Sequence, residues 1–166
     1  IIYLIMSNSS IGNQFEELVK IVQRLRGPDG CPWDKEQTAE SLISYMLEEA
    51  YEVIEAIDEK DWDGLKEELG DLMLHIVFQA SIAQDTKLFD ISESLKNIND
   101  KLIRRHPHVF DRKKLVKDKI KPSWELQKHK EKKRNSRLDG VPKSLPGLIQ
   151  AQRIQEKASY VGFDFE

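Results

Sequence analysis

Apolar residues recur at every third or fourth position along most of this chain, and that spacing predicts an all-α fold. No segment sustains the strict alternation of apolar and polar residues that a half-buried strand would need. We therefore expect helices over about 13–25, 38–59, 61–84 and 90–106, followed by a last helix from residue 144 or 145 to about 159. The long, closely spaced segments favour an antiparallel helical bundle.

Side chains suited to helix N-caps precede three of the predicted helices: Thr38, Asp61 and Asp90, the last with Glu93 as a capping box. Pro107 stops the helix that begins at Asp90, because the residue before a proline disfavours the α conformation. Residues 31–37 are expected to form a loop.

Two pairs of acids stand at helical spacing on consecutive predicted helices. Glu49 and Glu52 lie three residues apart in 38–59, and Glu68 and Asp71 lie three apart in 61–84. Each pair therefore shares one face of its helix. In an antiparallel pair of helices the four carboxylates converge, and they repel one another unless a cation lies between them. Hard oxygen ligands suit Mg²⁺, with Mn²⁺ as an alternative.

The acids of an acid-rich helix usually lie on a solvent-exposed face and bind no metal, which is the alternative to a metal site. A solvated helix normally interleaves charges of both signs, whereas residues 36–59 contain no Lys or Arg. The acids also stand among apolar residues, where an unpaired charge is costly to bury. The same pattern occurs on two successive helices, which favours the metal site.

Three sequence motifs resemble those of the MazG-type nucleoside triphosphate pyrophosphohydrolases. They are CPWDKEQT at 31–38, EEAYE at 48–52 followed after fifteen residues by ELGD at 68–71, and RRHPHVF at 104–110. The resemblance covers about 14–164. It implies the all-α NTP pyrophosphatase fold, completed by dimerisation with sites at the dimer interface. It also implies Mg²⁺-dependent hydrolysis of an NTP or dNTP at the α–β bond, giving a nucleoside monophosphate and pyrophosphate.

The resemblance assigns Mg²⁺ to the same four acids, Glu49, Glu52, Glu68 and Asp71. Glu48 projects about 100° away from Glu49 around the helix. Three roles for Glu48 stay open: support of the ligands, orientation of a water at a second metal, or simple solvation. We count it among the catalytic candidates.

A cluster of cations near residue 105 is the candidate triphosphate site. Lys101 and Arg105 lie four residues apart on one helix face, with Arg104 beside them. Arginine grips phosphate oxygens in a fork and lysine acts as a point charge. The resemblance places phosphate binding at Lys101 and Arg105. A basic last turn that only complements the helix dipole is the alternative.

Three further residues are candidates for the site, two of them for recognition of the nucleobase. Trp33 can stack on a base, and Asp34 can accept a hydrogen bond from an exocyclic amine, unless Trp33 only plugs the bundle end. His75, four residues after Asp71, either extends the acid site or packs as an ordinary helix histidine.

We expect four segments: a strand-like or disordered leader at 1–12, a catalytic helical domain at 13–110, a basic arm and linker at 111–143, and at 144–166 the opening helix of a truncated second repeat. A similar order of residues in two segments indicates a repeat. Val22–Gln23–Arg24–Leu25 precedes Trp33, and Ala151–Gln152–Arg153–Ile154 precedes Phe163. Tandem domains are frequent in the family that the motifs resemble. A catalytically weak, regulatory or dimerising half of such a protein is therefore the alternative to an active enzyme.

The cysteine content, the apolar runs and the net charge indicate the compartment and the partners of the chain. The single cysteine, Cys31, excludes an intrachain disulfide, and the longest apolar run is far shorter than the ~20 residues of a membrane span. We expect a cytoplasmic homo-oligomer, at least a dimer, with no membrane partner. The net charge of −3 argues neither for nor against a nucleic-acid partner. The basic run within 112–137 is expected to be a solvated arm or a lid, with nucleic-acid binding as the alternative.

Overall fold

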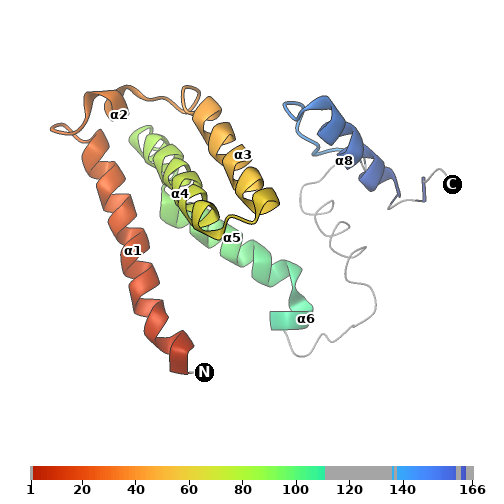
Figure 1. The fold of residues 1–166 in the computed structure, drawn as a ribbon, viewed down its shortest axis with the longest axis horizontal. Coiled ribbons are helices and arrows are strands. Elements are labelled where there is room, and N and C mark those ends of the chain that lie inside the picture. The colour runs from red at the N-terminus through yellow and green to blue at the C-terminus, as the bar shows by residue number, and fades with distance from the viewer. Residues whose placement is uncertain (1, 111–135, 137, 160–161, 164–166) are drawn as a thin grey trace. The chain divides into compact units, whose positions relative to one another are not determined.

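The computed structural model describes residues 2–110, 136, 138–159 and 162–163, and every regular element among them is a helix. The predicted all-α class is thereby confirmed for this part of the chain. The helices are α1 (Ile2–Arg26), α2 (Pro32–Glu36), α3 (Ile43–Glu59), α4 (Trp62–Asp85), α5 (Ile91–Arg105), α6 (Pro107–Phe110) and α8 (Gly147–Ser159) (Figure 1). Two compact units, Ile1–Asn97 and Ile98–Glu166, divide the chain, with their boundary inside α5.

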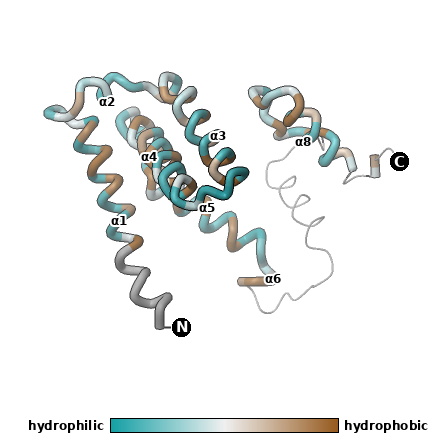
Figure 2. Tube along the Cα trace, in the orientation of Figure 1, coloured by the Kyte–Doolittle hydropathy of each residue, from teal (hydrophilic) through white to brown (hydrophobic). Residues whose placement is uncertain are grey.

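In the first unit, α4 lies between α1 and α3 and packs against both (Figure 1). The buried core joins Val22 of α1 and Leu42, just before α3, to Val77 and Phe78 of α4. Hydrophobic and hydrophilic residues alternate along these helices in Figure 2, as amphipathic packing requires. Full burial of side chains of this size contributes about 1.5–3 kcal/mol each.

Two of the predicted helix starts are confirmed by hydrogen bonds. Asp61 Oδ1 accepts from the Gly64 N–H at 3.0 Å at the start of α4. The Glu93 N–H donates to Asp90 Oδ1 at 2.8 Å at the start of α5. Each carboxylate satisfies one of the backbone donors that the first turn of a helix leaves free.

The link between α3 and α4 is short and depends on Lys60. This residue adopts the left-handed conformation with φ 59°, and its N–H donates to the carbonyls of Ala56 and Ile57. The Asp61 N–H donates to the Ala56 carbonyl at 2.9 Å, which closes the end of α3. The tight reversal places α3 and α4 side by side and antiparallel.

Three predicted boundaries were wrong. Helix α1 begins at Ile2, where a non-helical leader was expected; its first turns contain no proline, and the single Gly12 costs a helix only about 1 kcal/mol. Residues 32–36 form the short helix α2, whose first position is the favourable site for Pro32.

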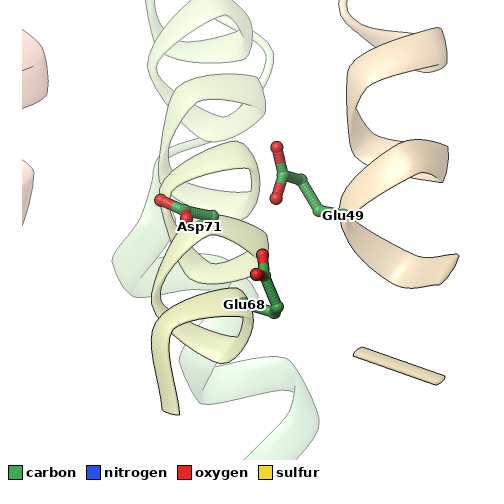
Figure 3. A group of neighbouring side chains, drawn as sticks. All are labelled: Glu49, Glu68 and Asp71. Atoms are coloured by element: carbon green, nitrogen blue, oxygen red, sulfur yellow. The ribbon is translucent and has the colours of Figure 1, made fainter. Parts of the chain in front are cut away.

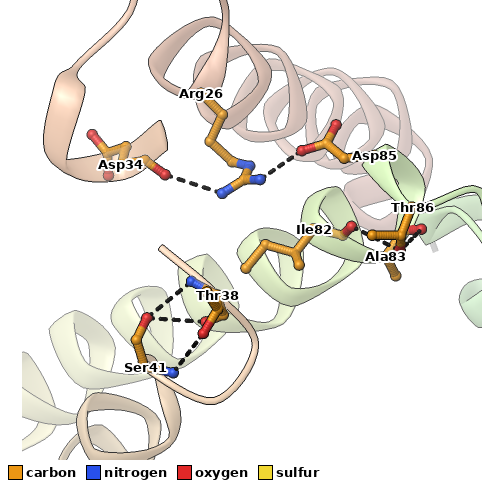
Figure 4. Close-up of polar contacts among 8 residues, drawn as sticks. All are labelled: Arg26, Asp34, Thr38, Ser41, Ile82, Ala83, Asp85 and Thr86. Carbon is orange, nitrogen blue, oxygen red and sulfur yellow. Dashed lines mark hydrogen bonds and ion pairs between the residues drawn. The ribbon is translucent and has the colours of Figure 1, made fainter. Parts of the chain in front are cut away.

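The third wrong boundary is the start of α3, which begins at Ile43 and not after Thr38. The Ser41 N–H donates to Thr38 Oγ1 at 3.1 Å, and the Thr38 N–H donates to Ser41 Oγ at 3.0 Å (Figure 4). These reciprocal bonds close a separate turn before the helix. Gln79 Nε2 of α4 donates to the Ala39 carbonyl at 2.9 Å and fastens that turn to the core.

In the second unit, α8 ends at Ser159 as predicted and begins at Gly147, two or three residues later than expected. Lys157 is buried on this helix, and its Nζ donates to the Asp139 carbonyl at 3.1 Å. The helix expected around 124–133, and most of the basic arm, lie outside the described residues. Among the described helices, none combines the length and apolarity needed to cross a membrane.

Candidate metal centre

Three carboxylates meet at the contact between α3 and α4. Glu49 extends from α3 toward α4, which carries Glu68 and Asp71 (Figure 3). One oxygen from each of the three residues lies within 4.8 Å of the others, and all three residues are half-buried. The helical spacing of Glu68 and Asp71 puts them on one face of α4, and the tight reversal at Lys60 brings α3 alongside.

The electrostatics of this cluster favour protonation or a bound cation. Burial first, and then the charges of Asp71, Glu52 and Glu68, raise the pKa of the Glu49 carboxyl. Burial first, and then the charges of Glu52, Asp71 and Glu67, raise the pKa of Glu68. Both carboxylates therefore lack sufficient positive charge around them in the metal-free protein.

Glu52, the fourth predicted ligand, stands at the edge of this group. It is not part of the close set of three among the described residues, yet its charge raises the pKa of both Glu49 and Glu68. A side-chain hydrogen bond with Glu52 also raises the pKa of Glu49, so Glu52 lies next to the close set.

An open groove of about 670 Å³ runs along the acidic side of α3. Glu48 and Glu52 both line this groove, so Glu48 is exposed beside the cluster and is separate from its three close oxygens. The other lining residues are Tyr51, Ile54, Glu55, Asp58 and Glu59.

A row of rings reaches the cluster from α2. Trp33 meets Tyr45 edge-on, with ring centroids 6.1 Å apart and an interplanar angle of 78°. Tyr45 stacks on His75 at 6.5 Å and 7°. His75 Nε2 lies 3.8 Å from Glu49 Oε1, and burial lowers the pKa of the imidazole. His75 therefore lies beside both Glu49 and Tyr45, and its role in the site stays a prediction.

Tyr45 was missed by the sequence reasoning, although the signal for it was available. It lies four residues before Glu49, just as His75 lies four residues after Asp71. Spacing of four places each ring on the same helix face as an acid of the cluster. Applying that rule to aromatic residues as well as to acids would have found it.

Helix α2, which carries Trp33 and Asp34, is held by Arg26 at the end of α1 (Figure 4). Arg26 Nη1 donates to the Asp34 carbonyl at 3.0 Å, and Nη2 contacts Asp85 Oδ2 at 2.5 Å. The guanidinium also lies over the ring of Phe78, 5.2 Å from its centroid. Trp33 is 51% exposed, so its ring remains accessible.

The predicted phosphate-binding residues belong to the second unit. Lys101 is half-buried, Arg104 is exposed and Arg105 is 8% exposed. The acid cluster belongs to the first unit, so the role of these cations toward the same ligand stays a prediction.

The acid cluster has the chemistry of a divalent-cation site: only oxygen donors, partial burial, and carboxylates with raised pKa values. An all-helical unit with carboxylates converging from paired helices defines a class of helical metal-binding domains. Within that class, residues 37–110 match the MazG nucleotide pyrophosphohydrolase domain, and this part of the chain belongs to that family. The resemblance seen in the motifs is thereby confirmed.

Several known proteins are similar to almost the whole chain. A Thermotoga maritima protein named nucleoside triphosphate pyrophosphohydrolase/pyrophosphatase MazG is 50% identical over 157 residues, which is 93% of this chain and 60% of the relative. The nucleoside triphosphate pyrophosphohydrolase of Escherichia coli strain K12 is 48% identical over 158 residues, or 92% of this chain and 60% of the relative. YabN of Bacillus subtilis, an uncharacterized protein, is 48% identical over 147 residues, 87% of this chain and 30% of its own length. The chain thus spans about 60% of the length of the first two relatives.

Proposed function

We propose that this chain hydrolyses nucleoside triphosphates or deoxynucleoside triphosphates at the α–β bond, releasing a nucleoside monophosphate and pyrophosphate. The observation that carries the proposal is the convergence of Glu49, Glu68 and Asp71 within residues that match a nucleotide pyrophosphohydrolase domain. The Thermotoga and Escherichia relatives are named for the same reaction class, which supports the proposal.

The three close carboxylates and Glu52 would hold the cation, which we propose to be Mg²⁺, with Mn²⁺ as an alternative. A hard dication suits a site built only of carboxylate oxygens. When bound, Mg²⁺ neutralises phosphate charge and makes a nearby water more acidic.

The remaining steps fall to side chains of the protein. Water attacks the α-phosphorus, the bond to the bridging α–β oxygen breaks, and pyrophosphate leaves. Glu48 is the proposed acceptor of the proton from the water, because it is exposed in the groove beside Glu52. Lys101 and Arg105, with Arg104 beside them, are the proposed partners of the triphosphate, whose charge they would offset.

The exposed Trp33 ring is the proposed stacking surface for the nucleobase. The Asp34 carboxylate is the proposed acceptor from an exocyclic amine, since Arg26 engages the backbone carbonyl of Asp34 and not its side chain. Loss of the ring in Trp33→Ala should raise KM more than it lowers kcat, because stacking holds the substrate as well as the transition state.

The first experiment measures pyrophosphate and phosphate release from a panel of NTPs and dNTPs, with Mg²⁺ and with EDTA. We expect Mg²⁺-dependent pyrophosphate release that Glu49→Gln or Glu52→Gln abolishes. Glu67→Gln is the matched control, because it removes the same charge from an exposed position next to the cluster.

The outcomes separate the alternatives. Phosphate release in place of pyrophosphate would mean that attack occurs at the γ-phosphorus. Full turnover in Glu49→Gln would refute the carboxylate site. No turnover by a folded protein that binds Mg²⁺ would favour the regulatory half of a tandem protein.

We also propose that the chain forms a homodimer through the outward faces of α3 and α4. Apolar side chains at helical spacing stay about half exposed on both helices, and together they form what we call the apolar stripe: Ile43, Leu47, Tyr51, Ile54 and Ile57 of α3, and Leu69, Met73 and Ile76 of α4. An exposed patch of this extent is typical of an interface. A second copy of the same face would cover it and complete a helical bundle.

A further inference from the structure

We propose that His75 is a positioning residue that holds the Glu49 carboxylate in the orientation needed to bind the cation. In this role the Nε2–H of the ring donates to one carboxylate oxygen while the other oxygen faces the metal. The inference rests on the proposed metal site and adds to it a residue that the acid motifs do not contain.

The geometry places a single polar group of His75 against the cluster. Nε2 lies 3.8 Å from Glu49 Oε1, and the two side chains are only 12% and 20% exposed. Nδ1 is buried and has no hydrogen-bond partner in the part of the chain that the structure describes. Glu49 is therefore the polar neighbour that explains why a histidine occupies this position.

Packing against Tyr45 restricts the orientation of the His75 ring. Tyr45 lies nearly parallel to it, with centroids 6.5 Å apart, and Trp33 abuts Tyr45 in turn. The ring therefore keeps Nε2 directed at α3 without a second hydrogen bond. The positions of Tyr45 and Glu49 on successive turns of α3 place both within reach of one α4 side chain.

A donor at this point counteracts the repulsion within the cluster. The charges of Asp71, Glu52 and Glu68 all act on Glu49 and disfavour its ionised carboxylate where it lies. An approach of less than about 1 Å would turn the 3.8 Å separation into an ordinary N–H···O hydrogen bond. Residues that hydrogen-bond to a ligating carboxylate typically contribute roughly 10- to 100-fold in metal affinity.

The test is calorimetric titration of the metal-free full chain with Mg²⁺ and with Mn²⁺. His75→Phe keeps a flat ring but no donor, and we expect it to weaken binding by roughly tenfold. His75→Gln can place its amide nitrogen near the Nε2 position and should restore most of the affinity. His75→Asn is the matched control, because its shorter amide reaches only the Nδ1 position.

Recovery in His75→Gln but not in His75→Asn separates positioning from mere packing. Wild-type affinity in His75→Phe, or equal loss in the Gln and Phe variants, would overturn the inference. Circular dichroism shows whether each variant is folded. If His75→Phe does not fold, the comparison of His75→Gln with His75→Asn still decides the test.

Glu49→Gln distinguishes failure of this inference from failure of the metal site itself. If Glu49→Gln binds Mg²⁺ like the wild type, the proposed site is wrong and the role of His75 falls with it. If Glu49→Gln loses binding while His75→Phe keeps it, the site stands and only the positioning role is refuted. In the double variant, His75→Phe should add no further loss, since the carboxylate that it orients is gone.

Discussion

The ionisation of Glu49 should make the metal-free fold less stable as the pH rises. Its pKa in the folded protein is raised above the usual 4.5, chiefly by burial and by the neighbouring acids. The stabilising contribution is therefore fully present below the unfolded pKa and is lost as the pH rises through the folded pKa. Glu68, whose pKa is raised for the same reasons, acts in the same direction.

We predict that Glu49→Gln in EDTA is more stable than the wild type at about pH 7.5, and that the difference shrinks toward about pH 4.5. Urea unfolding followed by circular dichroism at several pH values measures it. Saturating Mg²⁺ should reverse the order, because the cation pairs with the carboxylates of the wild type. A difference that is independent of pH would show that Glu49 is not coupled to its neighbours.

Spacing alone identified which acids share a helix face, because a helix fixes that relation locally. Which of them come closest depends on how α3 is rotated against α4, so the sequence could not place Glu52 at the edge of the close group. The same rotation sets the contacts of Tyr45 and His75. Similarly, spacing put Lys101 and Arg105 on one face, but burial of Arg105 is a property of packing.

At the scale of elements, helix starts were predictable where one local hydrogen bond decides them. Asp61 and Asp90 cap their helices as expected, since each carboxylate needs only a backbone N–H three residues on. Thr38 differs because Ser41 competes for the same backbone groups and closes a turn. The fastening of this turn by Gln79, 40 residues away, could not be predicted from local patterns.

Arg26 joins three elements, and its loss should destabilise the first unit. Arg26→Ala removes the contacts to Asp85, the Asp34 carbonyl and the Phe78 ring from a side chain that is 8% exposed. We expect a loss of about 1.5–3 kcal/mol, the usual value for hydrogen bonds to charged groups. The control is Lys66→Ala, whose ion pair with Asp63 is largely solvated and worth at most about 1 kcal/mol. Urea unfolding compares the two, and equal small losses would contradict a structural role for Arg26.

The reversal between α3 and α4 contains a correctable strain at Lys60. A side chain at φ 59° costs about 1–2 kcal/mol, while glycine adopts this conformation freely. Part of the gain is offset because glycine makes the unfolded chain more flexible. We predict that Lys60→Gly raises the midpoint of thermal unfolding, whereas Lys66→Gly, inside α4, lowers it. A lower midpoint for Lys60→Gly would mean that its side chain stabilises the reversal.

For the whole molecule, the exposed apolar stripe on α3 and α4 favours burial against a second copy of the chain. Leu47 and Ile76 are each 51% exposed, although both belong to helices whose opposite faces form the core. Leaving such surface in water forgoes about 25 cal/mol for every Å² that a partner could bury. The acids on α3 occupy a different face from the stripe, because Glu48 and Glu52 differ from Leu47 by about 100° or more around the helix. Tyr51 and Ile54 belong both to the stripe and to the groove beside Glu48, so a partner on the stripe would lie next to that groove.

We predict that light scattering at micromolar concentration gives the mass of a dimer, and that Leu47→Glu gives a monomer because it sets a charge against the apolar face of the partner. Leu88→Glu is the control, since Leu88 is 73% exposed and lies in the loop after α4, outside the stripe. A wild-type monomer would refute the homodimer, and dissociation by Leu88→Glu instead would move the interface away from α3 and α4. Mg²⁺ binding should survive in the Leu47→Glu monomer, because Glu49, Glu68 and Asp71 all come from one chain. If turnover is nevertheless lost in that monomer, the partner copy must supply part of the substrate site, and the dimer is then a requirement of the reaction as well as of the fold.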